Sequence, residues 1–158
     1  MKPSTLPFAA AAKEGVHALP SSEGNAASPA EKPTARRILV IDDHVETAES
    51  LAVCLRCEGY DARFECSSTS GIAMTNSWLP DIVILDADMP EPNGFETAAI
   101  IRNIVPNPDL IIIAFTGLDW PMGPERALEA GFDSYCQKGL PLRTLLDTIE
   151  TVSATSLR

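Results

Sequence analysis

The feature that most constrains the fold is a short apolar run, Ile82 to Leu85, which stops at Asp86. A run of this length, mostly β-branched and bounded by turn signals, is typical of a strand buried on both faces of a parallel sheet. The segment 90–94, with the sequence PEPNG, then imposes a loop. Asp86 is therefore predicted to lie at the carboxyl end of a buried strand, where open α/β sheets bind their ligands.

The rest of the chain alternates similar apolar runs with stretches of helical periodicity. Further strands are expected at 37–41, 60–66, 110–115 and 132–136. Helices are expected from 44 to a stop at Gly59, and then at 67–78, 95–103, 121–130 and 141–153. In the second helix we expect Ile72 and Ala73, with Asn76 as a further candidate, to face the core. Five strands alternating with five helices predict an α/β fold with a parallel sheet covered on both faces.

Composition divides the chain into two parts. Residues 1–35 contain five prolines, many alanines and serines, and no sustained period, which predicts a disordered N-terminal arm before a folded unit at 36–158. The arm is neutral, so the net charge of −10 belongs to the folded unit. Such a field repels phosphate backbones and predicts no direct nucleic-acid binding. No apolar run approaches 18 residues, so no membrane contact is expected.

Two cysteines, Cys54 and Cys57, have the spacing of a redox or zinc pair. On a helix this spacing places both on one face, where free cysteine behaves as a small hydrophobic residue. A thioredoxin-type pair should open a helix, whereas this pair falls near a helix end. We therefore expect core packing, with metal binding or a disulfide as the alternative. The absence of a secretory signal favours a cytoplasmic protein with reduced thiols.

Polar side chains follow four of the predicted strands. Asp42 and Asp43 follow the first, Asp86 the third, Thr116 the fourth and Lys138 the fifth. Parallel strands bring these ends to one edge of the sheet, where three carboxylates repel each other unless a cation joins them. Oxygen ligands of this kind suit Mg²⁺. A hydroxyl and an ammonium complete a site for a phosphoryl group, and the carboxylate of the third strand can act as the nucleophile that forms an acyl phosphate.

Five motifs occur in a diagnostic order. They are IDD at 41–43, ILDADMPEPNG at 84–94, FTG at 115–117, ALEAGFDSY at 127–135, and Lys138. In these motifs the chain resembles the response-regulator receiver domains of two-component signalling, and its spacings resemble those of chemotaxis receivers. The resemblance covers roughly residues 36–152. It implies a flavodoxin-like, doubly wound five-stranded sheet with the strand order 2-1-3-4-5.

The resemblance also implies roles at the acidic edge. Asp86 would accept a phosphoryl group from a histidine kinase or a histidine phosphotransfer protein. Asp42, Asp43 and Asp86 would hold Mg²⁺, together with the backbone carbonyl of Asp88. Such a chain is not an enzyme in the ordinary sense, because it catalyses only its own phosphorylation and dephosphorylation.

A conformational switch is implied as well. Thr116 and Lys138 would bind phosphoryl oxygens, and movement of Thr116 would let Tyr135 turn inward and reshape the surface that meets an unknown downstream protein. Few residues follow the last helix, so we expect a single-domain regulator acting by contact or a receiver portion of a hybrid kinase.

Three positions depart from the family pattern or extend it. Gly139 follows Lys138 where the family keeps proline, which predicts a looser loop. Asp88 adds a carboxylate near Asp86 and is expected to slow phosphorylation by repulsion or to alter hydrolysis of the acyl phosphate. His44 is expected to be a solvated residue at a helix start.

Two other functions compete with the receiver hypothesis. Asp86-x-Asp88 after a buried strand resembles the nucleophile and acid/base pair of Mg²⁺-dependent haloacid-dehalogenase phosphohydrolases. Against this class, the acidic pair comes first in the chain instead of last, and no cap domain is visible. The third possibility is an interaction domain that keeps the receiver fold and works without phosphorylation.

Overall fold

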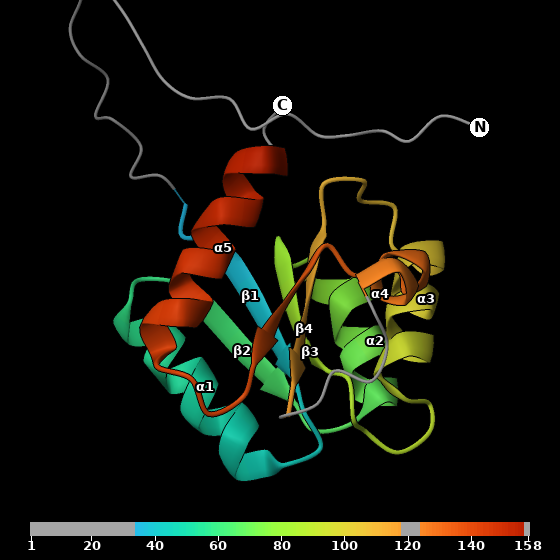
Figure 1. Cartoon of the computed structure of the whole chain (residues 1–158), viewed down its shortest axis with the longest axis horizontal. Coiled ribbons are helices and arrows are strands. Elements are labelled where there is room, and N and C mark those ends of the chain that lie inside the picture. Colours follow the sequence, from blue (N-terminus) through green and yellow to red (C-terminus); the bar gives the residue numbers. More distant parts are fainter. Residues whose placement is uncertain (1–33, 118–123, 157–158) are drawn as a thin grey trace, which may run out of the picture. The chain divides into compact units, whose positions relative to one another are not determined.

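The computed structural model describes residues 34–117 and 124–156, and the predicted arm lies almost wholly outside them. Strands and helices alternate along the described chain (Figure 1). They are β1 Arg37–Ile41, α1 Val45–Cys57, β2 Asp61–Glu65, α2 Ser68–Trp78, β3 Ile82–Asp86, α3 Gly94–Ile104, β4 Ile111–Thr116, α4 Pro124–Ala130, β5 Ser134–Gln137 and α5 Leu142–Ser156.

The strands form one parallel sheet in the order β2-β1-β3-β4-β5. Ile41 of β1 lies beside Leu85 of β3, and Asp86 lies beside Phe115 of β4. The carboxyl ends of these central strands therefore reach the same edge of the sheet. This confirms the predicted fold class and strand order.

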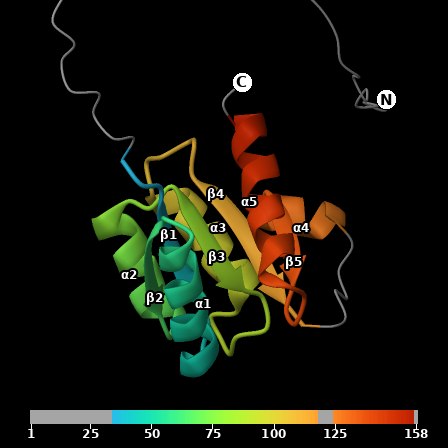
Figure 2. The ribbon, with the colours of Figure 1, turned by 90° about the vertical axis from the view of Figure 1, so that its left-hand side faces the viewer.

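Helices cover both faces of the sheet. Helices α1 and α5 pack on one face, and they are the helices nearest the viewer in Figure 2. Helices α2, α3 and α4 pack on the other face. Alternate residues of each central strand feed the two layers, as Ile82 and Ile84 do for one and Val83 and Leu85 for the other. All five residues of β3 are buried, as the continuous apolar run predicted.

The start of α3 is fixed against the end of β3. Asn93 caps the helix, accepting bonds from the amides of Phe95 and Glu96, while the Glu96 carboxylate accepts from the Asn93 amide. A Cβ on Gly94 would collide with the backbone of Asp86 and its neighbour, so only glycine permits this approach. The loop after Asp86 is thereby anchored at its far end.

The prediction for the cysteine pair was wrong. Cys54 and Cys57 are exposed, and all four cysteines are free thiols. Helix α1 turns Ala48, Ala52 and Leu55 toward the sheet, which places the pair on the solvent side.

The predicted face of α2 was only partly right. Ile72 is half-buried and packs against the core as expected, whereas Ala73 and Asn76 are exposed, and the buried positions include Gly71 and Thr75. A Cβ at Gly71 would clash with the side chain of Ile41, so the helix makes its closest approach to the sheet through glycine. Small residues therefore mark the closest approach, and Ile72, Met74 and Trp78 pack against the core beside it.

In the last third of the chain, the observed boundaries of helices and strands differ slightly from the predicted ones. Phe132 was expected in the fifth strand, but β5 begins at Ser134 and Phe132 packs in the core beside α3. The predicted helix start at 121 lies outside the described residues. Across the described ranges, no helix has the length and apolar character needed to span a bilayer.

Candidate functional site

The predicted polar residues meet at the carboxyl edge of the sheet. Asp42 directly follows β1, Asp86 ends β3, Thr116 ends β4 and Lys138 follows β5. Asp42, Asp86 and Thr116 are each at most 2% exposed. The topology thus brings together polar groups that are up to 96 positions apart in the chain. Such burial of two carboxylates requires compensation by positive charge or hydrogen bonds.

Lys138 supplies the nearest positive charge. Its Nζ lies 2.8 Å from Asp42 Oδ2 and 2.9 Å from Asp86 Oδ2. Burial by itself would lower the pKa of Lys138, but the two carboxylates outweigh that effect and raise the pKa above its usual value. The ammonium therefore stays charged and bridges both acids.

Despite this bridge, burial still disfavours the ionised form of Asp86. Burial raises the pKa of Asp86, while the Asp88 amide and Lys138 oppose the rise and Asp42 adds to it. The Asp88 amide donates to Asp86 Oδ1 at 2.9 Å. A buried carboxylate of raised pKa with an ammonium and an amide aimed at it is typical of a functional site.

The side chain of Asp88 makes contacts that sequence reasoning missed. Its Oδ2 accepts from Thr116 Oγ1 at 3.3 Å and from the Gly117 amide at 3.4 Å. The sequence indicates an extra carboxylate at Asp88 but not the direction of its side chain. The direction follows from the loop between β3 and α3, whose conformation no periodicity encodes.

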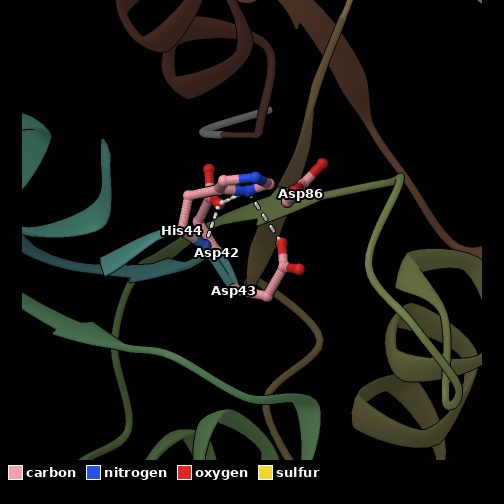
Figure 3. Close-up of side chains that lie close together, drawn as sticks. All are labelled: Asp42, Asp43, His44 and Asp86. Carbon is pink, nitrogen blue, oxygen red and sulfur yellow. Dashed lines mark hydrogen bonds and ion pairs between the residues drawn. The ribbon is translucent and has the colours of Figure 1, made fainter. Parts of the chain in front are cut away.

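The acidic residues fit a divalent cation. One donor atom from each of Asp42, Asp43, His44 and Asp86 lies within 4.8 Å of the others, and Figure 3 shows these four side chains converging. Asp42 Oδ2 is buried and accepts no well-directed hydrogen bond within the described chain, although Lys138 Nζ stands close to it. Three carboxylates with spare lone pairs match the oxygen-rich coordination of Mg²⁺.

His44 is a solvated residue at the start of α1, as expected, and it also lies beside this cluster. Its side chain is exposed, yet its Nδ1 lies 3.1 Å from Asp43 Oδ1 and 3.4 Å from Asp42 Oδ1. Its position directly after the acidic pair was a signal for this placement.

The loop after β5 takes a route that proline could not follow. Gly139 has φ of +84°, in the left-handed region, whereas proline is held near −65°. The Lys138 amide donates to the Thr116 carbonyl at 2.6 Å, which ties the loop to the end of β4. The loop differs from the family pattern and still delivers the ammonium to the two acids.

Tyr135 lies on β5 with 57% of its surface exposed. It lines a groove with Leu128 of α4 and with Phe132. The tyrosine is thus at the surface formed by α4 and β5. Positions 118–123 lie outside the described residues.

The fold and the acidic edge define a class of protein. The family model described as "Response regulator receiver domain" matches residues 38–150, most of the chain. The chain therefore belongs to the response-regulator receiver family.

Curated relatives carry the same domain. "DNA-binding response regulator MtrA" of Mycobacterium tuberculosis (strain ATCC 25618 / H37Rv) is 34% identical over 104 residues, which cover 65% of this chain and 44% of MtrA. "Transcriptional regulatory protein PdtaR" of Mycobacterium tuberculosis (strain CDC 1551 / Oshkosh) is 30% identical over 132 residues, covering 83% of this chain and 60% of PdtaR. The chain thus spans less than half of MtrA.

Solved structures agree on the fold. The CheY-like receiver domain protein of Methanospirillum hungatei JF-1 has a TM-score of 0.70 at 24% identity, over 77% of this chain and 96% of that one. The response regulator receiver domain protein of Clostridium thermocellum has a TM-score of 0.69 at 25% identity, over 76% and 95%.

Proposed function

We propose that this receiver accepts a phosphoryl group on Asp86 from a phosphohistidine of a histidine kinase or a phosphotransfer protein. The observation that carries the proposal is the arrangement around Asp86: a buried carboxylate at a strand end, with Lys138 Nζ on one oxygen and the Asp88 amide on the other. This arrangement orients a nucleophile and supplies positive charge beside it.

The chemical step is a displacement at phosphorus. A carboxylate oxygen of Asp86 attacks, the bond between phosphorus and the histidine nitrogen breaks, and its electron pair stays on the departing imidazole, which takes up a proton. Lys138 is already in place to pair with the new phosphoryl oxygens. Because the phosphoryl group stays on the protein until the acyl phosphate is hydrolysed, the protein acts as a phosphoacceptor that catalyses only its own phosphorylation and dephosphorylation.

Asp42, Asp43 and Asp86 would hold Mg²⁺, with the backbone carbonyl of Asp88 as a further ligand. When bound, the ion would neutralise charge on the carboxylates and on the incoming phosphoryl group. The burial of Asp42 and Asp86 beside each other supports this role, because the two buried carboxylates share the ammonium of Lys138.

Phosphorylation would act on a partner through Thr116 and Tyr135. We propose that the Thr116 hydroxyl and the Gly117 amide leave Asp88 and donate to the phosphoryl oxygens, because a phosphoryl group carries more charge than a carboxylate. Movement of Thr116 would then allow Tyr135 to turn inward and alter the surface of α4 and β5. We place the receiver in the cytoplasm, acting on a protein target without itself contacting nucleic acid, as its charge of −10 favours.

Intact mass spectrometry after incubation with acetyl phosphate and Mg²⁺ tests the proposal. Wild type should gain one phosphoryl group, and EDTA should prevent the gain. Asp86→Asn should gain none, whereas Asp109→Asn, an exposed control before β4, should behave as wild type. Uptake by Asp86→Asn would contradict the assignment, and rapid turnover of a generic phosphomonoester would favour a phosphohydrolase.

A further inference from the structure

His44 occupies a helix start without doing the work of a helix cap. It is the N-cap residue of α1, yet its side chain makes no capping hydrogen bond. Serine, threonine, aspartate and asparagine are the residues that stabilise this position, and histidine is not among them. The imidazole is instead directed at the acidic pair that precedes it (Figure 3). Helix stability therefore does not account for a histidine here.

The distances from the imidazole suit a shared metal ion. His44 Nδ1 lies 3.1 Å from Asp43 Oδ1 and 3.4 Å from Asp42 Oδ1. Two ligands about 2.1 Å from one ion, on adjacent coordination positions, stand roughly 3.0–3.4 Å apart. One carboxylate oxygen of Asp86 also lies within 4.8 Å of the donor atoms of Asp42, Asp43 and His44. His44 Nδ1 hydrogen-bonds the Asp43 carboxylate in this structure, and a bound ion would replace the shared proton at the same spacing.

The carboxylates present different atoms to Lys138 and to His44. Lys138 contacts Oδ2 of Asp42 and Oδ2 of Asp86, whereas His44 Nδ1 faces Oδ1 of Asp42 and Oδ1 of Asp43. Asp42 is almost completely buried, so its Oδ1 has a fixed direction. The backbone amide of His44 donates to this same Oδ1 at 2.9 Å, which helps to fix the direction of that oxygen.

We propose that His44 adds a nitrogen ligand to the acidic edge, so that the site binds a first-row transition-metal ion such as Co²⁺, Ni²⁺ or Zn²⁺ through mixed oxygen and nitrogen ligands. The proposal rests on the cation site of the proposed function and names the class of ion that it favours. Carboxylates alone suit Mg²⁺, whereas imidazole favours the later ions of the series. His44 would therefore raise affinity for those ions without raising affinity for Mg²⁺.

Calorimetric titration of the reduced, metal-free full chain with Co²⁺ and, separately, with Mg²⁺ tests this proposal. In His44→Ala the Co²⁺ dissociation constant should rise about tenfold or more, while that for Mg²⁺ should change less than about threefold. His17→Ala is the matched control, because His17 is the only other histidine in the chain, and it should bind both ions as wild type does. His44 is an exposed side chain, so its removal should leave the fold intact by circular dichroism.

Several results would overturn the proposal. Co²⁺ binding unchanged in His44→Ala would remove His44 as a ligand, and an equal loss for both ions would give it only a positioning role. Loss in His17→Ala, or a thiolate-to-cobalt absorption band in wild type, would move the ion to another site.

Phosphoryl uptake with Mg²⁺, measured on the same proteins, keeps the two proposals apart. Uptake without His44-dependent Co²⁺ binding defeats this inference alone. His44-dependent binding without uptake supports this inference and defeats the proposed function alone.

Discussion

At the scale of single residues, the buried Asp86 carboxylate destabilises the fold at the position that we propose accepts the phosphoryl group. Burial raises its pKa above the ordinary 3.8, so the folded state holds the ionised form at a cost relative to the unfolded chain. The cost is largest at neutral pH and disappears as the pH falls through the folded pKa toward 3.8. In EDTA, Asp86→Asn should therefore melt above wild type at pH 7, and the gain should shrink on acidification. A gain that grows as the pH falls would contradict the account.

Asp88 acts, on this account, as an internal competitor for the phosphoryl group. Its carboxylate holds the Thr116 hydroxyl and the Gly117 amide, the two donors that we assign to phosphoryl oxygens. Asp88→Ala should take up a phosphoryl group from acetyl phosphate several-fold faster, because both the repulsion and the competing acceptor are gone. Asp88→Asn removes the charge but keeps an acceptor, so its rate should lie between. Slower uptake in the alanine variant would refute the competition.

At the scale of elements, one arginine joins α3 to the neighbouring strands. The Arg102 guanidinium donates to the carbonyl oxygens of Gly131 and Leu110 and pairs with Asp133, whose carboxylate also accepts from the Ile112 amide. Arg102→Met should lower the free energy of unfolding by about 1–3 kcal/mol, because several polar groups lose their partner together.

Arg143, which also forms an ion pair, provides the control for the prediction on Arg102. Arg143 pairs with Asp147 on the exposed side of α5, where both side chains are more than half exposed. Arg143→Met should cost about 0.5 kcal/mol or less. Chemical denaturation of the two variants measures the difference, and equal losses would show that Arg102 has no special bridging role.

Also at the scale of elements, sequence predicted strands better than helix faces. A strand buried on both sides, such as β3, needs only an apolar run, so Ile82 to Leu85 identified it directly. The face of α2 depends on which residue lets the helix approach closest, and that residue is Gly71, which carries no hydrophobic signal. The exposure of Cys54 likewise follows from the rotation of α1, which its apolar spacing left ambiguous.

At the scale of the whole molecule, topology made the site predictable. Parallel strands place their carboxyl ends on one edge, so Asp42, Asp86, Thr116 and Lys138 could be grouped without any knowledge of contacts. The contact of Asp88 with Thr116 was not predictable, and for His44 the sequence signalled only its position beside the acidic pair, not the direction of its imidazole. Both depend on loop conformation and side-chain direction, which no sequence period reports.

Reductive trapping tests the central claim most directly. Phosphorylated wild type is treated with borohydride, which converts an aspartyl acyl phosphate to homoserine, and the peptides are sequenced by tandem mass spectrometry. Our account predicts homoserine at position 86 alone, and only in samples that received both Mg²⁺ and acetyl phosphate. Homoserine at position 42, 43 or 88, or no homoserine in a chain that binds Mg²⁺ and carries the added phosphoryl mass, would contradict the assignment of Asp86 as the phosphoacceptor.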